Sequence, residues 1–348
     1  MVGKEREKVP MLYFIVNYHG GSGNAKRTWN QVHDVLHARD IAYKSYVTKK
    51  AGDGKMLAEK ICQEIEEKRA QEEVKFAESG LPEEYALPKL IVVGGDGTIN
   101  EVLNGMSGFD NILFGVIPTG SGNDFPRGIG TSKKDTLECL EHILTDNRGK
   151  KIDLGQVTWY GEDGEKVGDK IFGVSSGIGL DAIVCKKAET SKIKKILNKF
   201  RMGNLTYPIL TVTSLFSMKT YHANIKFLDG DGESQQNISY RKMIFLAAMN
   251  FSAEGGGVPM SPGAEPDDGK LSICAVSEIP KWRTFTLFPI LLKGKHVGHK
   301  GFFLKDVTEL SIEAEEPMVL HTDGEYVADV QKADFRVLPQ ILNLLADI

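Results

Sequence analysis

Short apolar runs that end at glycine-rich turns organise the first 150 residues of the chain. Such runs are typical of strands in a parallel sheet that is buried on both faces. We expect strands at residues 11–17, 42–48, 90–93 and 113–117. Apolar residues recur at helical spacing after each run, which predicts helices that include 29–36, 54–68, 99–106 and 137–143. This alternation predicts an N-terminal, doubly wound parallel α/β lobe, with ligands outside the carboxyl ends of its strands.

The pattern changes after residue 150 to short β-rich runs that are separated by turn signals. The expected strands are 151–159, 170–175, 222–228, 242–249, 270–276 and 309–312. They predict a C-terminal lobe that is an antiparallel β-sandwich, with a helical insert near 186–217. The fold class is therefore α/β plus all-β. We expect one lobe at 1–150, joined by 335–348, and the other at 151–334, with the Glu-rich stretch 64–89 as a helix extension and solvated loop.

Three glycine-rich turns follow three of the predicted strands in the first lobe. They read NYHGGSGNAK (17–26), GGDGTINEVLNG (94–105) and PTGSGNDF (118–125). Glycine permits positive φ and lets backbone N–H groups approach a polyphosphate closely. Any one of these turns alone fits an ordinary αβ connection, but three of them are expected to converge at one sheet edge. None matches the P-loop or the GxGxxG fingerprint.

These motifs resemble the diacylglycerol kinase catalytic family. The chain is most similar to bacterial lipid kinases of the DgkB and YegS type, with sphingosine kinases and NAD kinases as more distant relatives. The resemblance covers nearly the whole chain, and it departs at Tyr18, where the family usually has proline, and in the length of the Glu-rich stretch. It implies a two-lobed fold that binds ATP in the cleft between the lobes, and it suggests a homodimer. The implied ATP-binding residues are Asn17, Ser22, Gly23, Asn24, Thr48, Gly94, Gly95, Asp96, Gly97, Thr98, Asn100 and Thr119.

A second motif, HTDGE at 321–325, lies in the C-terminal lobe. Its local sequence favours a hairpin turn, since Asp-Gly is a common turn pair. The resemblance instead implies that Glu325 accepts the proton of a lipid hydroxyl, with Asp323 and Asp96 as the other catalytic carboxylates. A hydroxyl is a poor nucleophile, and a carboxylate within reach can take its proton during phosphoryl transfer.

The acidic stretch at 265–271 resembles the structural magnesium loop of the same family. The resemblance implies an Mg²⁺ site made by an oxygen of Glu265, the Asp268 carboxylate and the Lys270 carbonyl. Hard cations prefer such oxygen ligands and keep several waters. The alternative is an acidic surface turn. We hypothesise that this metal positions Asp323 and Glu325 indirectly.

Composition and charge limit the partners and the location. The net charge of −4 over 348 residues argues against nucleic acid as a partner. No secretory signal and no apolar run near the ~20 residues of a membrane span is present. The four cysteines have no metal or redox spacing, and His296 and His299 are not at a convincing zinc spacing. We expect a cytoplasmic protein that meets its lipid substrate at the inner face of the membrane.

Two basic segments bear on that contact. Residues 186–201 hold seven Lys or Arg and one Glu, and residues 281–305 hold six Lys or Arg and no acid, with interspersed aromatic residues. Both fit an interfacial surface that is attracted to anionic lipid, and both also fit a solvated basic face.

The sequence leaves three functions to compare. The first is an ATP-dependent lipid kinase with diacylglycerol as the leading acceptor, the second is an NAD kinase, and the third is a catalytically silent nucleotide sensor on membranes. INEVLNG and PTGSGNDF favour the lipid kinase over the NAD kinase, and the presence of all the expected acidic residues argues against the silent sensor. Scattered apolar side chains form acceptor pockets, so the sequence does not identify the lipid.

Overall fold

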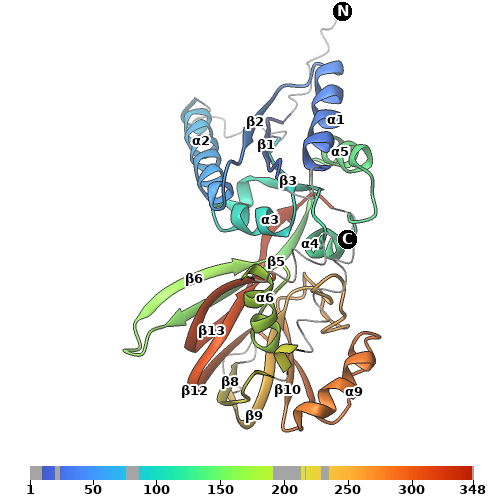
Figure 1. The fold of residues 1–348 in the computed structure, drawn as a ribbon. Coiled ribbons are helices and arrows are strands. Elements are labelled where there is room, and N and C mark those ends of the chain that lie inside the picture. Colours follow the sequence, from blue (N-terminus) through green and yellow to red (C-terminus); the bar gives the residue numbers. More distant parts are fainter. Residues whose placement is uncertain are drawn as a thin grey trace, which may run out of the picture. The chain divides into compact units, whose positions relative to one another are not determined.

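A computed structural model of the chain shows two compact units, which are described one at a time (Figure 1). The residues that the structure describes are 10–19, 24–75, 86–190, 213–215, 217–228 and 235–346. The first unit comprises residues 1–152 and 341–348, and the second comprises 153–340.

A parallel sheet with the strand order β4–β3–β1–β2 forms the centre of the first unit. Its strands are β1 (Leu12–Val16), β2 (Tyr43–Val47), β3 (Lys89–Gly94) and β4 (Leu113–Pro118). Every residue of β1 and β3 is buried, which explains their purely apolar character apart from Lys89. The four predicted strands are therefore confirmed.

Helices cover both faces of this sheet, as the doubly wound prediction requires (Figure 1). They are α1 (Asn24–Ala38), α2 (Asp53–Lys75), α3 (Asp96–Leu103), α4 (Asp124–Gly128) and α5 (Thr136–Thr145), with a short 3₁₀ helix at Phe109–Asn111. The helix α1 buries Trp29, Val32 and Leu36 in one cluster with α5 and the sheet. A capping box at Asp135 and Glu138 begins α5, since each side chain accepts a backbone N–H at that helix start.

The second unit is built from antiparallel strands around its own core. Its elements are β5 (Lys150–Tyr160), β6 (Lys166–Phe172), β7 (Ser175–Gly179), α6 (Leu180–Thr190), β8 (Tyr221–Leu228), β9 (Gln235–Met249), β10 (Leu271–Ser277), α9 (Lys281–Leu291), β11 (Phe302–Val307), β12 (Glu309–Thr322) and β13 (Glu325–Leu344). The long strands β9 and β12 pair with β7 near their carboxyl ends and with β8 further back. This pairing agrees with the predicted antiparallel sandwich lobe.

Four features differ from the sequence predictions. Strands β11 and β13 were not predicted, and the expected strand at 170–175 is split between the end of β6 and the start of β7. The return to the first unit starts at residue 341 instead of 335, because β13 stays paired with β12 as far as Arg336 and only Leu344 pairs with β4. The helical insert begins earlier than expected, at Leu180, and residues 191–212 lie outside the described residues.

Among the described residues, no helix has the length and apolar character needed to cross a bilayer.

Candidate active site

The second and third glycine-rich turns meet at the carboxyl edge of the parallel sheet, and Asn17 at the start of the first turn reaches them. The side-chain amide of Asn17 after β1 donates a 2.8 Å hydrogen bond to Thr98 Oγ1 in the turn after β3. The backbone N–H of Thr119 after β4 donates to the Gly94 carbonyl at 2.9 Å. Direct hydrogen bonds thus connect Asn17 to the second turn and the second turn to the third, at the edge where the sequence analysis expected the turns to converge.

Only glycine fits where the second and third turns cross. A Cβ added to Gly95 would lie 3.1 Å from the Gly120 Cα, and a Cβ added to Gly120 would lie 2.9 Å from the Gly95 Cα. Backbone N–H groups are therefore accessible here without side-chain obstruction, as phosphate binding requires. Asp96 reinforces the crossing, because its Oδ1 accepts a 3.1 Å hydrogen bond from the Phe125 N–H.

A buried hydroxyl at this edge has no partner. Thr119 is 7% exposed, and its Oγ1 forms no hydrogen bond among the residues that the structure describes. Leaving such a group unpaired costs roughly 1–3 kcal/mol. An acceptor such as a phosphate oxygen at this position would satisfy the hydroxyl, so the donor set fits a polyphosphate ligand.

The remaining predicted nucleotide residues have varied environments. Asn24 is exposed at the start of α1, Thr48 is buried beside the end of β1, and the backbone oxygen and side-chain oxygen of Asn100 accept hydrogen bonds from the Asn104 amide. Gly97 lies in the first turn of α3. Ser22 and Gly23 lie outside the described residues.

Glu101 is a supporting residue that the sequence reasoning did not single out. Its two carboxylate oxygens accept hydrogen bonds from the N–H groups of Gly52 (2.7 Å) and Gly54 (2.9 Å). Because Glu101 follows the GGDGT turn on α3, it ties the start of α2 to the nucleotide-facing edge. The motif INEVLNG contained this residue but gave no sign of its partner.

The HTDGE motif forms a two-residue hairpin turn between β12 and β13. Thr322 pairs with Glu325, and the intervening Asp323 and Gly324 have φ values of 48° and 80°. The Asp323 carboxylate accepts three backbone hydrogen bonds, from Gly173 (3.0 Å), Val174 (2.8 Å) and Ser175 (3.1 Å). Asp323 therefore anchors the hairpin to the start of β7.

Glu325 has a different environment from Asp323. Its side chain is 44% exposed, and the Lys170 ammonium lies 3.6 Å from its Oε2. A carboxylate in this position remains accessible to a ligand, while the neighbouring cation compensates its charge.

A His–Asp–Glu cluster lies beside the hairpin, and the sequence did not predict it. Asp181, Glu254 and His321 offer ligand atoms within 4.8 Å of one another, a spacing at which one cation can be held. His321 Nε2 lies 3.1 Å from Asp181 Oδ2, and the Ser175 hydroxyl donates to Glu254. Burial opposes the charged imidazole, but Asp181 outweighs this effect and raises the pKa of His321.

Next to the acidic loop at 265–270 lies a buried carboxylate that the sequence did not reveal, that of Asp153. Asp153 is fully buried, and its carboxylate accepts 2.7 Å hydrogen bonds from the N–H groups of Gly269 and Gln340. Burial, together with the nearby carboxylates of Asp268 and Asp267, raises the pKa of Asp153. The Asp268 Oδ1 accepts from the Lys270 N–H at 2.9 Å. Among the described residues, only Asp181, Glu254 and His321 offer three ligand atoms within 4.8 Å of one another, so the magnesium site at the acidic loop stays a prediction.

Comparison with known proteins agrees with this geometry. The family model for the diacylglycerol kinase catalytic domain matches residues 11–157, and the model for the YegS C-terminal NAD kinase beta sandwich-like domain matches residues 174–346. YtlR of Bacillus subtilis is 26% identical over 313 residues, which cover 90% of this chain and 92% of that protein. The diacylglycerol kinase of Staphylococcus carnosus is 27% identical over 322 residues, with 92% and 89% covered.

Solved structures show the same fold. A diacylglycerol kinase from Bacillus anthracis superimposes with a TM-score of 0.60 at 20% identity, and 97% of each chain is covered. Between them, the two family models span most of the sequence. The chain therefore belongs to the diacylglycerol kinase catalytic family and is an enzyme of the lipid kinase type, which uses a nucleotide as phosphate donor.

Proposed function

We propose that this enzyme transfers the γ-phosphate of ATP to the hydroxyl of a membrane lipid, with diacylglycerol as the acceptor and phosphatidic acid as the product. The observation that carries the proposal is the meeting of the second and third glycine-rich turns beside a Thr119 hydroxyl that has no partner among the described residues, with Asn17 bonded to Thr98. The relatives named diacylglycerol kinase support the acceptor class. We infer that the enzyme binds peripherally to the inner face of the cytoplasmic membrane and acts there.

The nucleotide phosphates would bind along the crossing of the second and third turns. Backbone N–H groups at 94–98 and the hydroxyls of Thr98 and Thr119 supply the donors, and Asn17 orients Thr98. Such preorganised donors stabilise the charge of the transferring phosphoryl group. Asn24, Thr48 and Asn100, together with Ser22 and Gly23, complete the proposed set.

We assign the proton acceptor to Glu325 and an anchoring role to Asp323. Three backbone N–H groups occupy the Asp323 carboxylate, whereas Glu325 keeps an accessible carboxylate two residues further on. Asp96 belongs to the first unit and supports the phosphate-binding turns.

Magnesium is proposed at the acidic loop, with Glu265, Asp268 and the Lys270 carbonyl as ligands. The Asp153 carboxylate stabilises this loop, since it accepts hydrogen bonds from the N–H groups of Gly269 and Gln340. When bound, Mg²⁺ would supply positive charge that offsets the clustered carboxylates.

A phosphorylation assay on a lipid panel tests this function. With labelled ATP and magnesium, label should enter a chloroform-extractable product of diacylglycerol, and Glu325→Gln should lower kcat by a factor of about 10² or more. The matched control is Glu315→Gln, which removes an exposed carboxylate on the neighbouring strand β12 and should keep full activity. Label in NADP would select the NAD kinase, and tight ATP binding without turnover of any lipid would select the silent sensor.

A further inference from the structure

The helix α9 and the residues that follow it expose three large apolar side chains. Thr284, Leu287 and Leu291 are buried and hold the helix on the core of the second unit. On the opposite side, Trp282 is 66% exposed, and Leu292 and Val297 just beyond the helix are 47% and 58% exposed. Exposed large apolar side chains that gather in one short segment indicate a contact surface.

The same segment carries positive charge that the protein does not neutralise. Residues 281–305 contain six Lys or Arg and no acid, in a chain whose net charge is −4. Within the described part of the chain, four of the six form neither an ion pair nor a side-chain hydrogen bond: Arg283, Lys293, Lys295 and Lys300. By contrast, Lys281 donates to the Met218 carbonyl, and Lys305 donates to Gln236 Oε1 at 3.1 Å.

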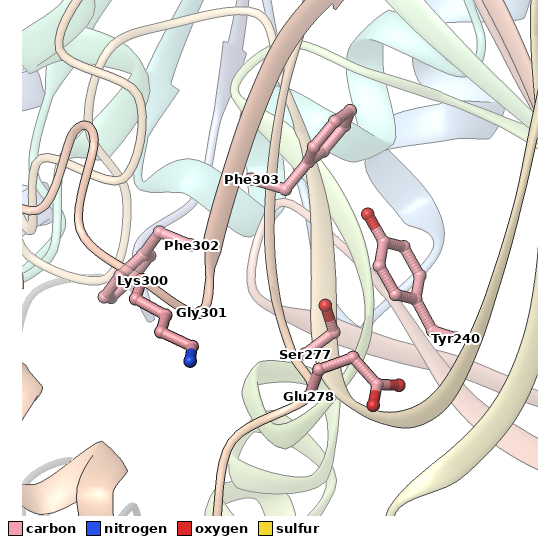
Figure 2. A pocket seen from close by; sticks show the side chains of 7 residues that line it. All are labelled: Tyr240, Ser277, Glu278, Lys300, Gly301, Phe302 and Phe303. Carbon is pink, nitrogen blue, oxygen red and sulfur yellow. The ribbon is translucent and has the colours of Figure 1, made fainter.

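A pocket adjoins this segment at the start of β11. The cavity of about 240 Å³ is shown in Figure 2 and is lined by Tyr240, Ser277, Glu278, Lys300, Gly301, Phe302 and Phe303. Three of its seven lining residues are aromatic, and Lys300 and Tyr240 stand on different sides of it. The carboxylate of Glu278 is occupied by the N–H groups of Arg241 and Lys242.

The residues that follow α9 pack against the loop at 259–262. His296 Nε2 lies 2.9 Å from the Met260 carbonyl, and Gly294 approaches Pro259 and Pro262. These contacts place the chain after α9 on the loop that follows Glu254.

We propose that the α9 face, defined as residues 281–300, docks on a bilayer of anionic phospholipid. The inference rests on the proposed function, because a lipid acceptor is presented in a bilayer. Unpaired lysine and arginine side chains are attracted to anionic headgroups, and an exposed tryptophan with flanking aliphatic residues inserts at the level of the headgroups. An anionic bilayer binds the basic side chains and also buries the apolar ones, whereas an acidic protein surface would bind the basic side chains and leave the apolar ones exposed.

Vesicle sedimentation of the full chain without nucleotide tests the docking. Vesicles that contain phosphatidylglycerol should bind the protein, while pure phosphatidylcholine vesicles should not. Lys293→Glu/Lys295→Glu should weaken binding by at least about tenfold. The matched control Lys166→Glu/Lys226→Glu makes the same change in charge on β6 and β8 of the same unit and should bind like the wild type. Equal losses in both variants, or no loss in the first, would overturn the proposal.

Tryptophan quenching by brominated phosphatidylglycerol locates the contact. Of the three tryptophans, Trp29 is buried and Trp159 is partly buried, so Trp282 should give the quenching. Trp282→Phe should abolish it, and Trp159→Phe should preserve it. Quenching that persists in Trp282→Phe contradicts docking through this face, as does binding to an acidic protein with none to vesicles.

Kinase activity on a short-chain acceptor dispersed in detergent separates the docking from the reaction. The Lys293→Glu/Lys295→Glu variant should keep this activity and lose activity on vesicles. A wild-type protein that binds vesicles but phosphorylates no lipid would refute the proposed function and leave the docking intact.

Discussion

Neutralising Asp323 in the HTDGE hairpin should mainly lower the stability of the protein, whereas neutralising Glu325 should mainly lower its activity. Asp323→Asn keeps the side-chain shape, and asparagine tolerates the left-handed φ of 48° as well as aspartate does. The substitution therefore removes charge and one acceptor without a change in backbone strain. Asp323 Oδ1 accepts from Val174 and Ser175, and Oδ2 accepts from Gly173. An asparagine keeps one oxygen for two of these donors and points its NH₂ group at the third.

The expected cost follows from these bonds. A hydrogen bond to a charged group contributes about 1.5–3 kcal/mol, and a neutral one contributes about 0.5–1.5 kcal/mol. Losing one charged bond and weakening two gives roughly 3 kcal/mol of lost stability, after a discount for the partial exposure of Asp323. At about 2–4 °C per kcal/mol, Tm should fall by about 6–12 °C.

Thermal unfolding by circular dichroism and kinase assays on the same samples measure both effects. Glu325→Gln should keep Tm within about 1 °C of the wild type while kcat falls, because its side chain is 44% exposed and its ion pair with Lys170 is long, at 3.6 Å. If Asp323→Asn unfolds at the wild-type temperature yet loses activity, the anchoring role is wrong and Asp323 takes part in the chemistry.

Two further predictions follow from the site. Gly120→Ala brings a Cβ to 2.9 Å from the Gly95 Cα and should raise the KM for ATP by about tenfold or more. The control Gly263→Ala has open space around its Cβ and should leave the KM for ATP unchanged. A Gly120→Ala enzyme with the wild-type KM would show that no phosphate binds at this crossing. The pKa of His321 is raised in the folded state, so its ion pair with Asp181 stabilises below the unfolded value of about 6.5, and that contribution is lost as pH rises through the folded pKa. Asp181→Asn should therefore destabilise the protein most near pH 6 and least near pH 9 in urea unfolding, and a constant difference would contradict the pairing.

The parallel sheet was readable from the sequence because its strands are buried on both faces. Such strands appear as apolar runs, and the glycine turns after them mark where each strand ends. Strand β11 gave no such signal, since most of its residues are only partly buried and its FFLKDV sequence does not alternate. Its aromatic residues and lysine looked like part of a basic surface segment, and part of that segment is indeed exposed.

The acidic residues beside the hairpin could not be predicted, because their convergence depends on strand pairing. Asp181 and His321 are 140 positions apart, and Ser175 and Glu254 are 79 apart. They meet because β7 pairs with both β9 and β12, a choice that no local motif encodes. Asp153 and Gln340, at a separation of 187 positions, meet for a similar reason.

The HTDGE motif had two competing interpretations, a hairpin turn and a catalytic site. The local sequence favoured a turn, and the family resemblance favoured catalysis. The structure has a tight turn with positive φ at Asp323 and Gly324, so the chain reverses within two residues and Thr322 pairs with Glu325. The turn residue can then reach the backbone of 173–175, and the first residue of β13 keeps its carboxylate accessible. An anchor and a base two residues apart are possible because this turn fixes one of them to β7.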